Sequence, residues 1–207
     1  KSVVLASGGS TRCWSVCSGS WEYTGDGHAL ALWAGAELRD MEFVQFHPTG
    51  MVWPPSVRGI LVTEGVRGEG GRLTNSDGDR FMFNYVPEMF QGDHAETIEE
   101  ADQWVEEVVS GKLATVRRPP ELLTRDVVAK AIKAEVEAGR GSPHCGAFLD
   151  ISHRGEEAIK KKLPSMYHQF MELAGVDITK DAMEVGPTAH YIMGGIRVDA
   201  ESQETTV

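Results

Sequence analysis

Six polar side chains in this sequence are of the types that bind a small dianion and move protons beside it. Four of them are hydrogen-bond donors: His47, Thr63, Arg125 and His190. A dianion at neutral pH needs several donors, including positively charged ones, that converge in a site with little water. The other two, Glu64 and Arg67, add groups able to exchange protons next to such a site. The six together predict a dianion site with a proton path.

Each of these residues alone also has a purely structural interpretation. His47, which precedes a proline, is compatible with a hydrogen-bonded buried histidine, and Glu64 with Arg67 is compatible with an internal ion pair. His190 is compatible with a core strand. Arg125 is less easily explained, because it is expected on the first turn of a helix, where the positive helix N-terminus disfavours a cation. Its position indicates an anion nearby.

Composition narrows the class of protein. The chain has 207 residues, 41% hydrophobic and 25% charged, which is typical of a globular protein. A formal net charge of −11 argues against nucleic-acid binding, which requires clustered Lys and Arg. No run of residues is long and apolar enough for a membrane span, and the N-terminus lacks the pattern of a signal peptide. The three cysteines, Cys13, Cys17 and Cys145, favour free thiols in a reducing cytoplasm, and we expect no metal site.

Patterns along the chain predict the elements that must position these side chains. We expect helices at 26–36, 97–109, 125–138, 156–163 and 165–174, and strands at 3–7, 41–47, 59–63, 148–151 and 194–199. Thr124 is the expected N-cap of the third helix. Residues 72–75 and 80–83 read as a hairpin around a Ser-Asp-Gly-Asp turn. The stretch between Pro87 and Pro120, hereafter the acidic excursion, is weakly patterned and is expected on the surface.

The two ends of the chain are expected to continue into a larger fold. Residues 3–9 read as a buried strand running into a glycine turn with no upstream strand to pair with it. The final strand-like segment likewise fades into polar residues. Strands and helices alternate without a regular βαβ order, so we expect a mixed α+β lobe inserted into a larger α/β fold.

Five short motifs, in order, resemble the signatures of the succinate dehydrogenase/fumarate reductase flavoprotein family. They are DMEFVQFHPTG at 40–50, LVTEG at 61–65, RGEGG at 67–71, RDVV at 125–128 and AHYIMGG at 189–195. The resemblance implies a mixed α+β capping domain over 47–187, flanked at 1–46 and 188–207 by partial segments of an FAD-binding α/β (Rossmann-like) domain. It also implies that the chain is an internal fragment that is inactive by itself.

The resemblance further implies how the site residues act. The reaction is the interconversion of succinate and fumarate, with hydride exchange at flavin N5. Arg125 resembles the proton donor and acceptor, Glu64 and Arg67 its proton relay, and His47, Thr63 and His190 the ligands of the substrate carboxylates. FAD is expected near Ala6, Ser7, Gly8, Gly9, Gly25, Asp26, Gly27, His190 and Tyr191, since glycines and helix N-termini admit phosphates closely. Expected partners are membrane anchor subunits and an iron-sulfur subunit, on the cytoplasmic face of the cell membrane.

Two alternatives remain open from the sequence. The motifs also resemble L-aspartate oxidase, which would take an amino-dicarboxylate in place of succinate. The second alternative is a lobe that folds alone as a non-catalytic capping or interaction domain, with Lys160 to Lys162 and the acidic excursion around Glu96 to Glu107 as contact surfaces.

Overall fold

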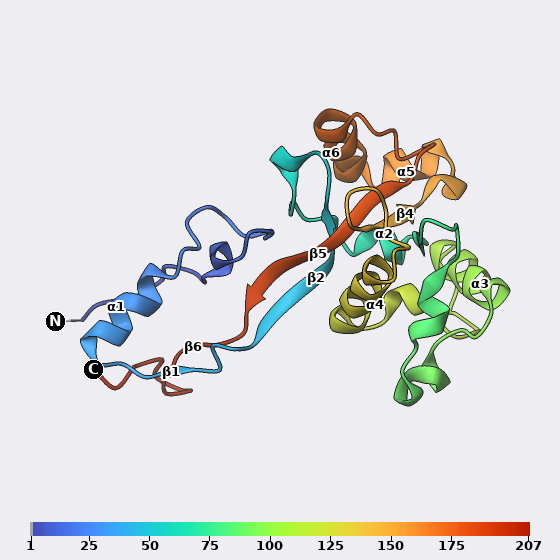
Figure 1. Cartoon of the computed structure of the whole chain (residues 1–207). Helices are drawn as coiled ribbons and strands as arrows, with labels where there is room; N and C mark the ends of the chain where they lie inside the picture. The colour runs from blue at the N-terminus through green and yellow to red at the C-terminus, as the bar shows by residue number, and fades with distance from the viewer. Residues whose placement is uncertain (1) are drawn as a thin grey trace.

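Two long antiparallel strands connect the ends of the chain to a folded lobe. The computed structural model describes residues 2–207. Strand β2 (Val44–Met51) pairs with β5 (Met183–Ile192) from Val44 opposite Ile192 to Met51 opposite Val185. Figure 1 shows this ribbon leading from α1 and both termini at one end to the remaining helices at the other. The strands that carry His47 and His190 are therefore neighbours.

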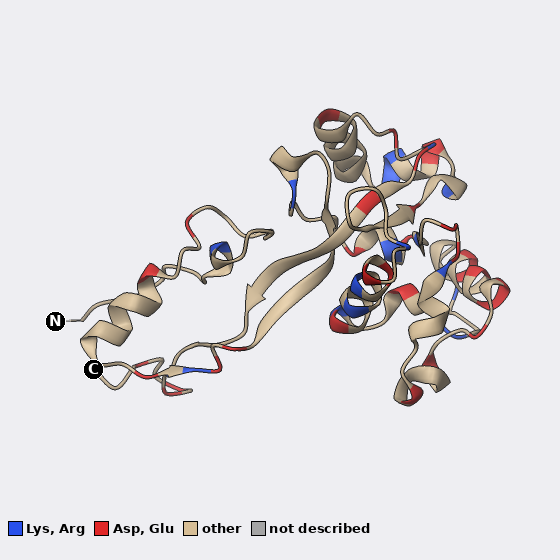
Figure 2. Ribbon diagram, viewed as in Figure 1, with Lys and Arg blue, Asp and Glu red and all other residues tan. Residues whose placement is uncertain are grey.

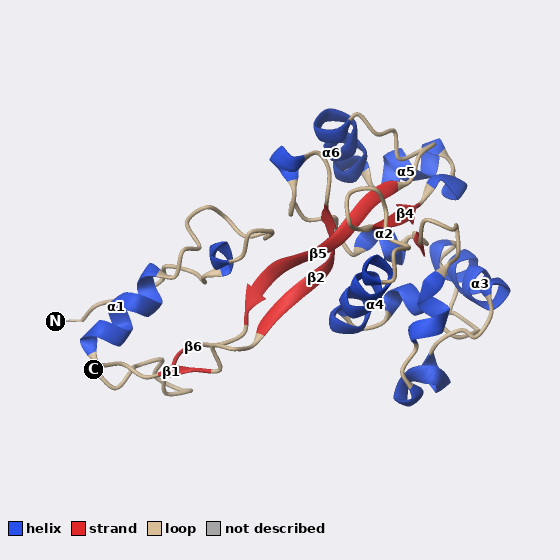
Figure 3. Cartoon of the chain, in the orientation of Figure 1, coloured by secondary structure: helices blue, strands red, loops and turns tan. Residues whose placement is uncertain are grey.

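The ribbon continues into a small sheet. Strands β4 (Ala147–Asp150) and β3 (Arg72–Thr74) extend it in the order β2-β5-β4-β3, and β1 (Leu38–Arg39) pairs separately with β6 (Gly195–Ile196). Every strand ladder within residues 2–207 is antiparallel. The described structure is thus mixed α and β with antiparallel sheets (Figure 3), and the flanking segments contain no parallel βαβ unit among these residues.

Six α-helices within residues 2–207 accompany the sheets. They are α1 (Asp26–Ala34), α2 (Gly65–Gly68), α3 (Ile98–Val109), α4 (Arg125–Glu137), α5 (Glu156–Lys162) and α6 (Pro164–Ala174). Helix α4 packs on β2 and β5 because its stripe of Val128, Ala131 and Ile132 is apolar and buried. Arg125 consequently begins a helix that lies against the strands of both histidines. None of the described helices is long and apolar enough to cross a membrane.

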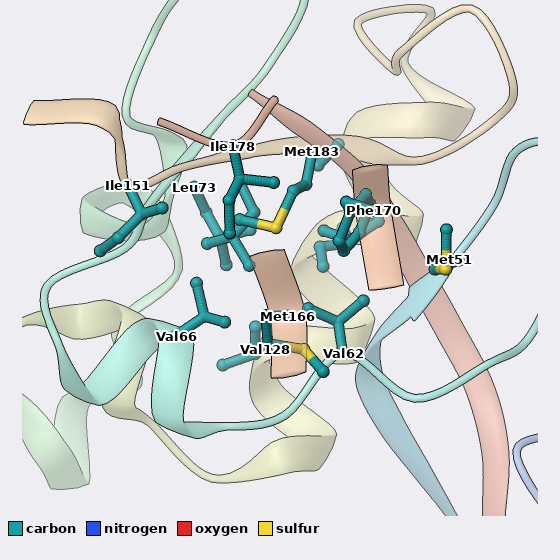
Figure 4. Packing of buried hydrophobic residues seen from close by; sticks show 14 of the residues in the cluster. Met51, Val62, Val66, Leu73, Val128, Ile151, Met166, Phe170, Ile178 and Met183 are labelled. Atoms are coloured by element: carbon teal, nitrogen blue, oxygen red, sulfur yellow. The ribbon is translucent and has the colours of Figure 1, made fainter. Parts of the chain in front are cut away.

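The hydrophobic core lies within the lobe. All members of the main buried cluster fall between Met51 and Val185, inside the range predicted for the capping domain. Figure 4 shows residues from both the sheet and the helices meeting there, with Leu73, Phe170 and Met183 among them. Each such side chain contributes about 1.5–3 kcal/mol on burial. The core therefore holds the elements that carry Glu64, Arg67 and Arg125.

Two expected β elements are wrong. Residues 3–7 form no strand and are exposed, since no other described strand pairs with them. Residues 81–85 form a 3₁₀ helix instead of the second half of a hairpin, and β3 pairs with β4. Phe81 and Met82 are both buried, which differs from the alternation of a strand with one face in solvent. The turn itself exists, because Asn75 accepts hydrogen bonds from the backbone N–H groups of Asp77 and Asp79.

Two further strands differ from expectation. The segment 59–63 forms only an isolated bridge between Leu61 and Gly50, and the last strand shrinks to β6. Pro187 lies inside β5. A proline is tolerated there because the ladder to β2 is interrupted between Thr188 and Gly186, so no N–H is needed at that position.

Candidate functional site

The two histidines meet through an irregularity in the ribbon. Gln45 pairs with Tyr191 and the next residue of β2 pairs with Ala189, which leaves His190 as the unpaired residue of a β-bulge. Bulges re-aim side chains and are common beside functional sites. The rings of His47 and His190 lie 5.3 Å apart, edge to face. Ser18 places its hydroxyl 2.8 Å from Nδ1 of His190 and so orients that ring.

Both imidazoles are held in the neutral form. His47 is 2% exposed, and burial, followed by the charge of Arg67, lowers its pKa from 6.5 to about 4. Its Nδ1 lies 3.1 Å from the carbonyl oxygen of Thr49. Burial and the charge of Arg125 also lower the pKa of His190. The positive field near the histidines therefore comes from the two arginines.

Thr49 ties Thr63 and Glu64 to β2. Its hydroxyl donates to the carbonyl of Val62 at 2.8 Å, and the Val62 N–H donates to the Thr49 carbonyl at 2.9 Å. Thr63 and Glu64 follow directly and lead into α2. The Thr63 hydroxyl accepts a 3.3 Å hydrogen bond from the N–H of Gly65, which starts that helix. Thr63 and Glu64 are thereby held at the edge of the strand that carries His47.

Arg125 is held by two side chains from different elements. Its Nη1 donates to Oε1 of Gln45 at 2.8 Å, and its Nε lies 3.3 Å from Oε2 of Glu64. Thr124 precedes the helix as expected, but its side chain makes no capping hydrogen bond to the helix. The carboxylate of Glu64 therefore offsets the unfavourable position of Arg125 on the first turn of α4.

Glu64 also contacts the second arginine. Oε2 of Glu64 lies 3.6 Å from Nη2 of Arg67, so one carboxylate stands between two guanidinium groups. Arg67 is 1% exposed, and its Nη1 donates to the backbone carbonyl of Glu121 at 2.6 Å. Its Nε and Nη2 have no hydrogen-bond acceptor within 3.5 Å among the described residues. Burial lowers the pKa of Arg67, and the charge of Glu64 opposes that shift.

A cavity of about 1050 Å³ opens on Arg125. Gln45, Phe46, Glu64 and Pro187 line it together with residues of α4. A small ligand in this cavity can reach the guanidinium of Arg125. Neither histidine lines the cavity. The six predicted residues therefore lie near one another, but they do not all face the same cavity.

The residues expected to approach FAD gather at the start of α1. A methyl group added at Gly27 would stand 1.8 Å from Oγ of Ser7, so a larger residue at this position would force Ser7 to move. Gly8 and Gly25 have φ values of +73° and +86°, which also favour glycine. No side chain caps α1, and its first N–H groups are therefore available to an anion. Asp26 on the same turn is suited to hydroxyl groups.

Ser7, Gly8, Gly25 and Gly27 are hereafter called the glycine cradle. The other flavin candidates lie close to it. Ala6 precedes Ser7 and is exposed, and Gly9 lies against Ile192, since an added methyl group would stand 3.6 Å from its side chain. Tyr191 is 60% exposed on the same strand end. The glycine cradle, the uncapped helix and the exposed aromatic ring are compatible with an anionic dinucleotide with an aromatic ring system.

Sequence reasoning missed three residues that hold the site. Gln45 is bonded to Arg125, Ser18 to His190, and Glu121 to Arg67. Gln45 could have been found from the sequence, because it lies two residues before His47 in the same strand. Ser18 and Glu121 could not, because their contacts join segments far apart in the chain.

Comparison with known proteins gives one family and several relatives. The family described as "FAD binding domain" matches residues 1–206. One relative, from the fumarate reductase (CoM/CoB) of Methanothermobacter marburgensis, is 48% identical over 198 residues, covering 96% of this chain and 30% of its own length. The "Succinate dehydrogenase flavoprotein subunit" of Coxiella burnetii is 36% identical, covering 100% of this chain and 30% of its own. The solved structure "Mycobacterium smegmatis Sdh1 in complex with UQ1" is 60% identical with a TM-score of 0.69, over 94% of this chain and 27% of that one. The chain thus spans about a third of the length of these relatives.

Proposed function

Because this chain belongs to the FAD binding domain family, with fumarate reductase and succinate dehydrogenase flavoproteins among its relatives, we propose that it serves an FAD-dependent oxidoreductase that interconverts succinate and fumarate. The observation that carries the proposal is the position of Glu64 between Arg125, at 3.3 Å, and Arg67, at 3.6 Å. A carboxylate between two guanidinium groups is a short path for a proton from the protein interior to the cavity.

Arg125 is the proton donor and acceptor in this proposal. FAD, when bound, supplies hydride exchange at N5 with one central carbon of the substrate. Reduction of fumarate then needs a proton at the other central carbon, and Arg125 delivers it from the cavity wall. A guanidinium normally keeps its proton to above about pH 12, so the transfer requires a strongly basic carbon and rapid reprotonation. Glu64 returns the proton to Arg125, and Arg67 replenishes Glu64.

His47, Thr63 and His190 bind the substrate carboxylates. The lowered pKa values keep both imidazoles neutral, and Arg125 and Arg67 supply the positive charge that a dianion requires. Burial strengthens these contacts because water competes less for the donors.

The flavin is held by the cradle at α1. Backbone groups of residues 6–9 and 25–27 take the anionic part of FAD, and His190 and Tyr191 adjoin its ring system. Residues 47–187 act as a capping domain over this base, with 1–46 and 188–207 as segments of the FAD-binding domain. Membrane anchor subunits and an iron-sulfur subunit complete the assembly and hold it at the cytoplasmic face of the cell membrane.

Ligand titration tests the proposal. Calorimetry of the chain with FAD, then with fumarate or malonate, is repeated with Arg125→Ala and with Arg58→Ala, which removes an exposed arginine outside the site. We expect the first variant alone to weaken dicarboxylate binding, by at least about 30-fold. Turnover of succinate against aspartate, in the full-length protein that contains this chain, separates the proposal from an aspartate oxidase. Turnover of aspartate alone, or equal binding by all three proteins, would refute it.

A further inference from the structure

A buried ion pair lies behind the two arginines of the candidate site. Glu121, on the 3₁₀ helix Pro120–Leu122, is 0% exposed. Its carboxylate binds Arg80 through two parallel contacts, 2.5 Å from Nε to Oε1 and 3.1 Å from Nη2 to Oε2. Such two-point contacts fix both partners in orientation as well as in distance. A buried carboxylate is costly unless it is paired and hydrogen-bonded, and Arg80 supplies both contacts to Glu121.

Glu121 touches the proton path twice. Its backbone carbonyl accepts the only hydrogen bond under 3.5 Å that the Arg67 side chain makes within the described residues. It also lies four residues before Arg125, so the same short helix leads into the first turn of α4. Through Glu121, Arg80 therefore fixes the carbonyl group that accepts the hydrogen bond from Arg67. It also fixes the segment that leads into Arg125.

The pair of Arg80 and Glu121, hereafter the clamp, is also connected to the acidic excursion. Nη1 of Arg80 donates to Asp102 on α3 at 2.9 Å, and the second oxygen of Asp102 accepts from Arg72 on β3 at 2.7 Å. Figure 2 shows acidic residues on and around α3. The acidic excursion is thus anchored to the same pair.

We propose that Glu121, held by Arg80, is a positioning residue that fixes Arg67 and the start of α4. It thereby sets the distances from Glu64 to Arg67 and to Arg125. This inference rests on the proposed function. Glu121 does not line the cavity and is not itself catalytic.

The charge of Glu121 gives the proposal a measurable signature. Arg67 faces the charges of Glu64, Arg125 and Glu121, and it in turn lowers the pKa of His47. Burial lowers the pKa of Arg67, whereas Glu64 and Glu121 raise it. Removing the charge of Glu121 therefore lowers the pKa of Arg67 further. The exchange of the Arg67 guanidinium protons with solvent reports directly on how firmly the contact with the Glu121 carbonyl holds the side chain.

A matched pair of variants separates positioning from general stability. Glu135 is a second buried glutamate, 2% exposed, and it binds Arg140 through two contacts of 2.8 Å on the far part of α4. Glu121→Gln and Glu135→Gln each remove one buried charge, but only the first contacts the proton path. Arg80→Lys keeps the charge of the clamp and removes its two-point geometry, so it serves as a second test if Glu121→Gln does not fold.

Two readouts are measured on these variants. In the full-length flavoprotein, we expect Glu121→Gln to lower kcat for succinate by about 10- to 100-fold, with the kcat of Glu135→Gln unchanged. In the 207-residue chain, NMR should show solvent exchange of the Arg67 guanidinium protons about tenfold faster in Glu121→Gln alone. Arg80→Lys should reproduce both effects more weakly.

The outcomes separate this inference from the proposed function. Equal behaviour of the two glutamine variants in both readouts overturns the positioning role. If the wild-type flavoprotein turns over no succinate, the proposed function fails, and the exchange rates of Arg67 alone then decide whether Glu121 positions it.

Discussion

Acidification should destabilise this fold through His47. The buried imidazole has a pKa of about 4, against 6.5 for an exposed histidine. Between these values the unfolded chain takes up a proton that the folded chain refuses, so the free energy of unfolding falls as the pH falls through this window. The full difference amounts to about 3 kcal/mol, of which about 2 kcal/mol is lost between about pH 7.5 and pH 5.

Urea unfolding at about pH 7.5 and pH 5 measures this difference. The wild-type chain should lose about 2 kcal/mol more than His47→Gln, which has no proton to gain at that position. Other histidines with lowered pKa values contribute alike to both proteins and cancel. His168→Gln, at an exposed position, is the control and should lose as much as the wild type. Equal losses in the wild type and in His47→Gln would refute the reasoning, because burial would then not keep the ring neutral.

Two further predictions concern the cradle and the helix ends. Gly27→Ala should weaken FAD binding at least about tenfold in a flavin fluorescence titration, because its methyl group would collide with Ser7, whereas Gly92→Ala, with no atom within 4 Å, should bind normally. Similar affinities in both variants would mean that the flavin does not use this cradle. Thr97→Ala should lower the free energy of unfolding by about 1 kcal/mol in urea, since Thr97 caps α3, and Thr124→Ala should cost less because its side chain makes no such bond. The reverse order would contradict the assignment of the caps.

The helices were predictable because their signals are local. Helix α4 was expected from Arg125 onward and begins there, since an apolar stripe with the period of a helix needs no knowledge of the partner it packs on. Helix α3 likewise starts after Thr97. The hairpin after β3 failed for the opposite reason. Its turn residues are locally correct, but the burial of Phe81 and Met82 together is decided by the core, which the local pattern does not contain.

The sequence singled out the residue types of the candidate site more readily than their geometry, and the chemical roles of these residues stay a prediction. Residue types identified Arg125, Glu64 and Arg67, and the structure brings them into contact. The bulge that turns His190 toward His47 depends on the register between two strands that lie far apart in the sequence. Local sequence patterns do not specify such a register. For the same reason Glu121 went unnoticed, although it contacts the residues that were identified.

The clamp between Arg80 and Glu121 closes the acidic excursion at its base. Each doubling of a closed loop adds only about 0.6 kcal/mol of entropic cost, so an insertion in the exposed stretch 110–114, outside the buried residues of this segment, costs little. Such an insertion leaves Arg125 in place, provided that Arg80 and Glu121 stay. This stretch is accordingly a suitable place to insert a fluorescent or affinity reporter into the protein.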